Sequence, residues 1–242
     1  MTASAAIARM RHGSLDQVGM ERAQHGADRM ATLPGVTLVF WATKLLVTVP
    51  AQMIGQIINQ WGKPLLWPAT AALIIVAFAG AAGGRIASVR LARAAFWTAT
   101  FGVTVLTTVL AERVDLTLGI GDIPACLHLA VVLLICFVLD YRFTGTVPML
   151  PYGWRQEPFF WTVAVLAQMF ASAVADWLLD PGGPGAGPAV GPLAAGILMA
   201  SALYFFKLVS RAIVFWIAFV LAGVAGALAG QMLLDRISAL TG

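Results

Sequence analysis

The chain has 242 residues, of which 60% are apolar and 11% are charged, whereas an ordinary soluble domain has roughly 45–50% and 25%. A water-soluble fold of this size could not bury so much apolar surface, so we expect lipid to cover it. The net charge of +4 does not indicate a nucleic-acid partner, because the basic residues lie at the ends of apolar runs and form no basic face.

Residues 1–32 lack the apolar segment of a secretory signal peptide, so we expect them to form a cytoplasmic N-terminal tail. Residues 33–242 are expected to form a single transmembrane domain. Apolar runs of the length that crosses a hydrocarbon core of about 30 Å occupy residues 33–60, 65–84, 92–118, 123–139, 159–179, 190–206 and 212–234. The sequence therefore predicts an all-α, polytopic membrane protein with about seven transmembrane helices.

Lysines and arginines are distributed unevenly between the two sets of connections. Eleven lie on the side of the N-terminal tail and three on the other side. Basic connections stay in the cytoplasm. The asymmetry therefore predicts a cytoplasmic N-terminus and a C-terminus on the periplasmic or outer side.

The dipeptide Phe-Trp occurs four times, each time near the start of an odd-numbered run, where an indole suits the headgroup boundary. When the four segments are aligned on tryptophan, offsets ten and fourteen hold only Gly, Ala or Thr. Offset fifteen always holds an acid or an amide, which chance would give with a probability near 10⁻³ over ~25 offsets. The four pairs are Phe40-Trp41, Phe96-Trp97, Phe160-Trp161 and Phe215-Trp216.

This recurrence predicts four parallel two-helix repeats, with the last repeat truncated after its long helix. Their approximate bounds are 33–84, 90–141, 155–207 and 209–242. The small residues in each long helix favour close helix packing, which predicts that the four long helices form the inner bundle.

The segment 33–46, LPGVTLVFWATKLL, resembles the repeat of a bacterial family of membrane-anchored proteins built from a repeat of unknown function (DUF347). That repeat reads Phe-Trp-x-x-Lys, followed by Gly-Glu/Thr/Ala-x-x-Gly-Asp. The resemblance covers about residues 33–236 and implies four repeats in a bacterial inner membrane. This chain departs from the family acids, because Gln52 and Gln56 stand in the first repeat, Glu112 in the second and Gln231 in the fourth.

Offsets eleven and fifteen stack on one face of each long helix and form the main candidate site. Carboxylates in a membrane span should face the bundle interior or a wet cavity. One interpretation is a site for a cation, a proton or a polar solute, and another is polar glue between helices. A third is a position at the outer interface, and Asp115 is a further candidate that could pair with Arg113. The stripe consists of Gln52, Gln56, Thr108, Glu112, Ser172, Asp176 and Gln231.

Three further ionisable residues are secondary candidates. Lys44 is expected to extend to the cytoplasmic headgroups, or else to pair with a buried acid. Asp180 and Asp235 are expected to be interfacial helix ends, or else a funnel that attracts cations. His128 is expected to be a hydrogen-bonded core residue, and Cys126 and Cys136 to be unpaired apolar fillers, because ten residues of helix separate them by ~15 Å.

The sequence favours a small transporter or channel-like carrier for a cation or polar solute. The alternative is a non-transporting scaffold, assembly factor or complex subunit. An enzyme is less favoured, because no nucleophile and base are suitably spaced. No metal or cofactor motif is present, and a homo-oligomer or a larger membrane complex stays open.

Overall fold

The computed structural model describes residues 36–60, 89–119, 121–145, 157–180 and 184–241. All regular structure in these residues is α-helical. Each of the six helices is long and apolar enough to cross a membrane, as an integral membrane protein requires. They are α2 (Leu38–Gln60), α4 (Val89–Leu118), α5 (Asp122–Thr144), α6 (Glu157–Leu179), α7 (Ala186–Phe205) and α8 (Arg211–Thr241).

Six of the seven expected helices are therefore present. The expected tail (1–32) and the expected second helix (65–84) lie outside the described residues. The last helix was expected to end near residue 234 but continues to Thr241, because no glycine or proline stands between residues 231 and 241. Pro50 and Pro192 lie inside α2 and α7, where proline removes one backbone hydrogen bond from the helix.

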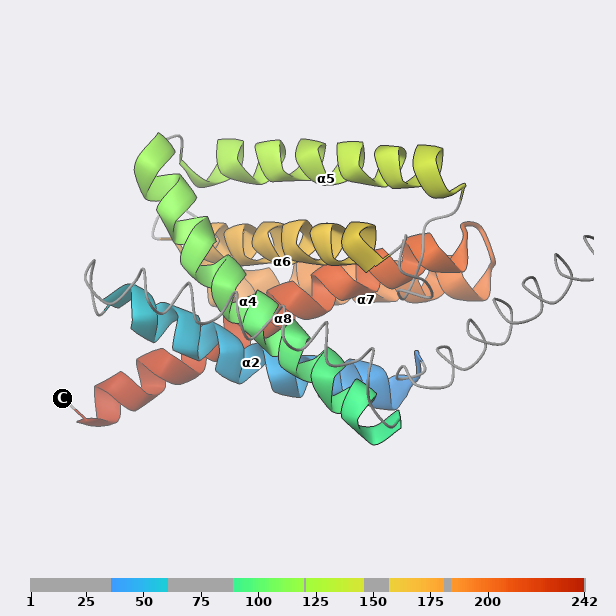
Figure 1. Cartoon of the computed structure of the whole chain (residues 1–242). Helices are drawn as coiled ribbons and strands as arrows, with labels where there is room; N and C mark the ends of the chain where they lie inside the picture. Colours follow the sequence, from blue (N-terminus) through green and yellow to red (C-terminus); the bar gives the residue numbers. More distant parts are fainter. Residues whose placement is uncertain (1–35, 61–88, 120, 146–156, 181–183, 242) are drawn as a thin grey trace, which may run out of the picture.

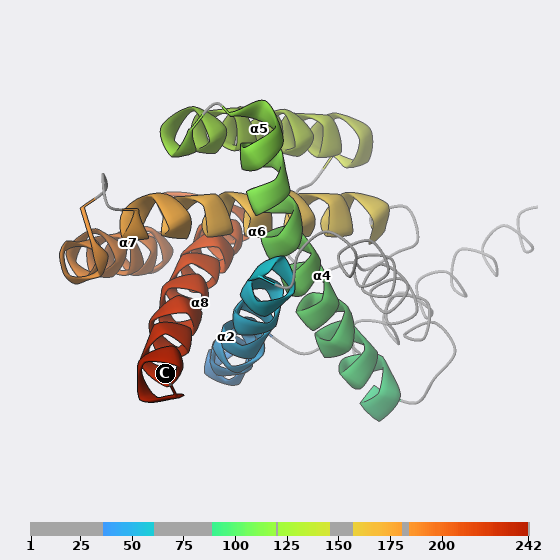
Figure 2. The same ribbon diagram turned by 90° about the vertical axis from the view of Figure 1, so that its left-hand side faces the viewer.

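The four long helices α2, α4, α6 and α8 pack in a ring, in that order, with α8 closing back onto α2. They run in the same general direction across Figure 1, whereas α5 and α7 run back. Each returning helix packs on the long helix that follows it in the chain, α5 on α6 and α7 on α8. Figure 2 shows α5 above α6, with α2 and α8 below, and α4 running from the level of α5 past α6 to the lower part of the view.

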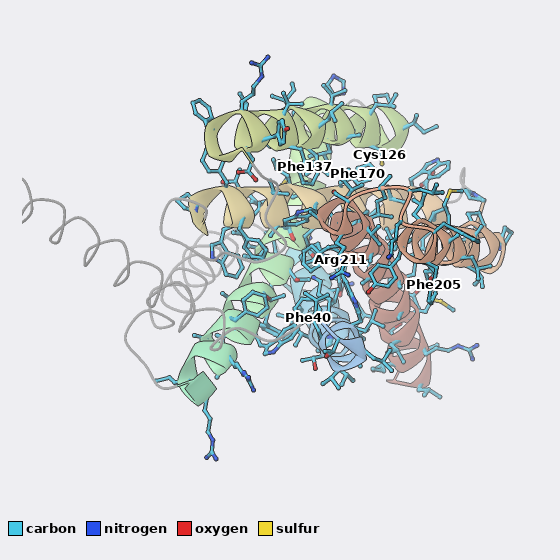
Figure 3. All side chains as sticks on the ribbon, turned by 90° about the vertical axis from the view of Figure 1, so that its right-hand side faces the viewer. Phe40, Cys126, Phe137, Phe170, Phe205 and Arg211 are labelled. Atoms are coloured by element: carbon cyan, nitrogen blue, oxygen red, sulfur yellow. The ribbon has the colours of Figure 1, made fainter. Side chains whose placement is uncertain are left out.

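Burial separates the inner helices from the outer ones. About half of the residues in the apolar windows of α4, α6 and α8 and 33% of those in α2 are buried, compared with 17% in α5 and 11% in α7. Apolar side chains such as Leu127, Leu134 and Leu198 remain exposed on the two outer helices, and Figure 3 shows side chains projecting outward from α5. The outer helices therefore present the apolar surface that lipid would cover.

The four Phe-Trp pairs pack on one another instead of serving as separate anchors. Each phenylalanine is buried and lies against the tryptophan of the next long helix, with the ring order closing on itself. The ring centroids are 5.2 Å apart for Phe40 and Trp97, 5.9 Å for Phe96 and Trp161, 5.6 Å for Phe160 and Trp216, and 5.5 Å for Phe215 and Trp41. The four pairs are therefore not independent of one another, and their tilted ring contacts stabilise the bundle.

Small residues bring the long helices into contact beyond this aromatic layer. A Cβ added to Gly226 would lie 2.5 Å from Thr48 Cγ2, and one added to Gly55 would lie 2.7 Å from Thr108 Cβ. Distances this short leave no room for a methyl group. The predicted packing role of the small-residue stripes is confirmed at these two positions.

Adding a methyl group at Gly226 is expected to destabilise the protein. Gly226→Ala places a carbon against the β-branched Thr48, and overpacking of this kind typically costs about 1–3 kcal/mol. The thermal midpoint in detergent, followed by fluorescence-detected size-exclusion chromatography, measures the effect. Gly191→Ala on α7 is the matched control, since nothing lies within 4 Å of its added Cβ. Equal midpoints for the two variants would contradict the close helix approach.

Candidate functional site

The interior of the ring carries polar side chains at intervals of four residues. At offsets three, seven and eleven from tryptophan, every side chain of the four long helices is buried. Residues four apart lie on the same helix face, so the four positions at each offset form one layer of the bundle interior. We call these layers the first, second and third depth. They are Lys44, Thr100, Ala164 and Phe219, then Thr48, Thr104, Gln168 and Gly223, then Gln52, Thr108, Ser172 and Ala227.

Three of the predicted site residues meet at the third depth. The Thr108 hydroxyl on α4 donates to Gln52 Oε1 at 2.5 Å, and Gln52 Nε2 on α2 donates to Ser172 Oγ on α6 at 2.9 Å. Gln52 therefore bridges two other helices across the ring. The fourth position at this depth is Ala227, also buried, which leaves room for the glutamine side chain.

The offset-fifteen residues lie less deeply. Gln56, Glu112, Asp176 and Gln231 are all half-buried, in contrast to the fully buried side chains one turn earlier. The four equivalent positions are thus less buried at offset fifteen than at offsets three, seven and eleven. Among the remaining candidates, Asp180 and Asp235 are exposed near helix ends, and the side chain of Asp115 lies outside the described residues.

Lys44 is buried in the bundle, with 1% of its surface exposed. Its ammonium group donates a hydrogen bond of 2.9 Å to Gln168 Oε1 on α6 and lies 4.2 Å from the centroid of the Phe219 ring on α8. The expectation that Lys44 extends to the headgroups is wrong, because residues of the three other long helices surround its side chain. Its partner is an amide rather than the acid that was the other expectation.

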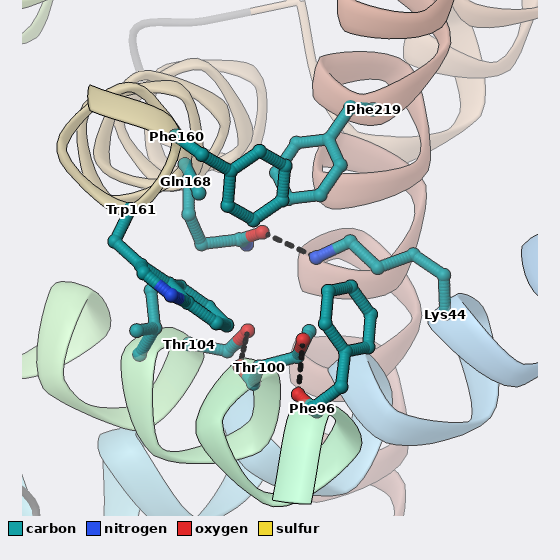
Figure 4. Close-up of a pocket in the computed structure, with 10 residues that line it drawn as sticks. Lys44, Phe96, Thr100, Thr104, Phe160, Trp161, Gln168 and Phe219 are labelled. Carbon is teal, nitrogen blue, oxygen red and sulfur yellow. Dashed lines mark hydrogen bonds between the residues drawn. The ribbon is translucent and has the colours of Figure 1, made fainter. Parts of the chain in front are cut away.

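A small cavity lies beside the Lys44 ammonium group. Its volume is about 10 Å³, close to that of a single water-sized sphere. The side chains around it are drawn in Figure 4, with the ammonium group and the Gln168 amide side by side. Residues from all four long helices line it: Lys44, Phe96, Thr100, Val103, Thr104, Phe160, Trp161, Ala164, Gln168 and Phe219.

Two of the cavity's side chains carry buried N–H groups without an acceptor. Gln168 uses its oxygen for Lys44, while its Nε2 has no hydrogen-bond partner, and the same holds for Trp161 Nε1. An unsatisfied buried polar group costs about 1–3 kcal/mol. Two such groups at one cavity are a feature that calls for a ligand or a solvent molecule.

The threonines around the cavity already use their hydroxyl hydrogens. Thr100 donates to the Phe96 carbonyl at 2.8 Å, and Thr104 donates to the Thr100 carbonyl at 2.9 Å. Bonds of this kind, to the preceding helical turn, keep a hydroxyl in an apolar segment satisfied. The donors left for a bound group are therefore those of Lys44, Gln168 and Trp161.

Sequence reasoning missed Gln168, Trp161 and Phe219 as site residues. The signal was available in the tryptophan alignment, because Gln168 stands at offset seven, one turn before the offset-eleven stripe, and Phe219 stands at the same offset as Lys44. His128 was expected in the core but is exposed on α5, where its Nδ1 lies 2.6 Å from the Pro124 carbonyl oxygen. Cys126 and Cys136 form no disulfide with each other, as predicted.

Within the described ranges, no cluster of three or more His, Cys, Asp or Glu residues is placed to hold a metal ion. The donor set at the Lys44 cavity is also unsuited to a cation, because it consists of N–H groups rather than carboxylate or carbonyl oxygens. Comparison with protein-family models, with curated proteins and with solved structures finds no match.

Proposed function

We propose that the chain is an integral membrane protein built from four parallel copies of one helix unit, and that it carries a small ion or polar solute through the interior of its long helices. The copies are supported by the closed order of phenylalanine–tryptophan contacts. They are also supported by the equal offsets of the buried interior positions. The sequence of this helix unit also resembles the Phe-Trp-x-x-Lys repeat of the bacterial membrane-anchored family.

The observation that carries the functional proposal is the burial of Lys44 among four apolar helices. An ionisable side chain inside a membrane is expensive to insert, at least ~2.5–3.5 kcal/mol on insertion scales. Such residues are kept where they handle a substrate or an ion. Lys44 lies beside a cavity lined by all four long helices, which is the place that a carrier uses for its occluded solute.

The proposed setting is the inner membrane of a bacterium, with the N-terminus in the cytoplasm. The distribution of eleven basic residues against three supports this orientation. In this orientation Lys44 lies in the cytoplasmic half of α2, whereas Glu112 and Asp176 lie toward the outer half of the membrane. Both carboxyl residues stand twelve residues beyond the positions equivalent to Lys44, which corresponds to about 18 Å of helix. The polar interior would then offer groups of opposite charge at its two ends.

Replacement of Lys44 is expected to abolish solute flux. Proteoliposomes containing the wild type, Lys44→Met, Glu112→Gln or Asp176→Asn are tested for proton, potassium and chloride flux with entrapped dyes, and for urea and glycerol flux by light scattering. The wild type should pass at least one probe. Lys44→Met should lose that flux at least tenfold, and the two carboxyl variants should reduce it.

Lys207→Met is the matched control, because Lys207 is exposed at the turn before α8 and its loss removes the same charge outside the interior. Size-exclusion profiles and thermal midpoints establish that each variant is folded. A wild type that passes none of the probes, or a Lys44→Met variant with undiminished flux, would overturn the carrier proposal.

A scaffold is the second candidate function, and the Gln52 network favours it. Its hydrogen bonds join α2, α4 and α6 directly. Interhelical hydrogen bonds of this kind hold membrane bundles together with average coupling energies of about 0.6 kcal/mol. A protein that only needs a stable bundle would use its polar interior in this way.

A double-mutant cycle measures how strongly this network holds the bundle. Gln52→Leu and Ser172→Ala are expected to show a coupling energy of about 0.5–1.5 kcal/mol, since they share one hydrogen bond. Unfolding in mixed micelles gives the free energies. The control pair combines Gln52→Leu with Ser201→Ala, because Ser201 is exposed and bonds only its own helix at Ile197. A coupling energy of zero for the first pair would show that the Gln52–Ser172 hydrogen bond does not stabilise the bundle.

A further inference from the structure

We propose that the Lys44 cavity binds a small inorganic anion of halide size. The inference deepens the carrier proposal above and rests on it only for the role of the site, not for binding itself. It follows from the charge, the hydrogen-bonding groups and the volume found at one place in the bundle.

The Lys44 ammonium group has no counter-charge among the residues that line the cavity. The Lys44 ammonium group is buried, and in the described part of the chain its partners are the neutral Gln168 amide and the neutral Phe219 ring. A buried charge is strongly unfavourable unless an opposite charge accompanies it. The carboxyl groups of Glu112 and Asp176 belong to positions about three helical turns away. The buried Asp140 lies on α5, outside the ring of long helices, and is not among the residues that line the cavity. An anion in the cavity supplies the missing counter-charge at contact distance.

Hydrogen bonding is the second argument, and it is independent of charge. An ammonium group has three N–H donors, of which Lys44 uses one for Gln168 Oε1. The Gln168 Nε2 and Trp161 Nε1 groups have no acceptor. All the unpartnered groups at this cavity are therefore donors, from α2 and α6. The residues that line the cavity include no carboxylate for a cation, whereas an anion accepts hydrogen bonds from donors of this kind.

Volume restricts the anion to a small one. A cavity of about 10 Å³ admits roughly one water-sized sphere, which excludes a carboxylic acid or a phosphate. A monatomic anion is the remaining class: fluoride is about as large as a water molecule, and chloride is larger and requires small shifts of the side chains around it. The glycine at the offset of Gln168 contributes to the shape, since a Cβ on Gly223 would lie 3.3 Å from Gln168 Oε1 and 2.7 Å from Ala171 Cβ. A single water molecule fits the same space but leaves the ammonium charge uncompensated.

Anion-dependent thermal stability of the purified protein tests the inference. The protein in detergent is titrated with sodium chloride against sodium gluconate at constant ionic strength, because gluconate is too large for the cavity. A ligand that binds only the folded state raises the unfolding midpoint in a saturable way. Chloride should do this for the wild type, and fluoride and bromide serve as smaller and larger probes.

Three variants assign the effect to the site. Lys44→Met should abolish the chloride-dependent shift, corresponding to at least a tenfold loss of affinity. Trp161→Phe removes one N–H and keeps an aromatic ring, so it should fold normally and weaken chloride binding a few-fold. Lys207→Met, which removes an exposed lysine, should behave as the wild type.

Equal midpoints in chloride and gluconate would overturn the inference and indicate that water occupies the cavity. An unaltered chloride shift in both Lys44→Met and Trp161→Phe would overturn it as well. The result also separates this inference from the carrier proposal. Saturable chloride binding without flux in proteoliposomes would support the anion site and contradict the carrier proposal. Flux of another probe without chloride binding would support the carrier proposal and contradict the anion site.

Discussion

The close approach of the four long helices determines what their interior can hold. Where Gly226 meets Thr48 and Gly55 meets Thr108, the space between the glycine and the threonine side chain is narrower than a methyl group requires. In lipid no hydrophobic force draws helices together, so this contact and the aromatic ring contacts provide the packing energy. A long polar side chain can enter such an interior only where its neighbours are small.

That constraint explains how the polar residues are distributed. Each buried depth combines one long polar side chain with an alanine or glycine at an equivalent position: Lys44 with Ala164, Gln168 with Gly223, and Gln52 with Ala227. The four long helices therefore place their buried positions at the same offsets, while the side chains at those positions differ from helix to helix. Both polar atoms of the Gln52 side chain have a hydrogen-bond partner, whereas N–H groups remain without acceptors one turn away at Gln168 and three turns away at Trp161.

Much of this arrangement could be predicted from the sequence. Apolar length indicates the helices, and the regular positions of Phe-Trp and of small residues indicate which helices lie inside. The shared face of Gln52, Thr108 and Ser172 was also predicted, although their bonds depend on side-chain conformations that spacing does not determine. Lys44 was misjudged because its distance from a helix end says nothing about whether other helices cover it. His128 was misjudged because α5 is apolar all round, so its sequence does not distinguish the protein side from the lipid side.

The order of the helices in the ring has a consequence for biosynthesis. Lys44 lies in the first described helix, while Gln168 and Phe219 come from α6 and α8, more than a hundred residues later in the chain. During translation the ammonium group therefore enters the membrane well before its partners are synthesised, and it must stay near the aqueous boundary or be shielded by the insertion machinery. Withdrawal of this lysine into the bundle becomes a late step of assembly, and it depends on the arrival of the last helix.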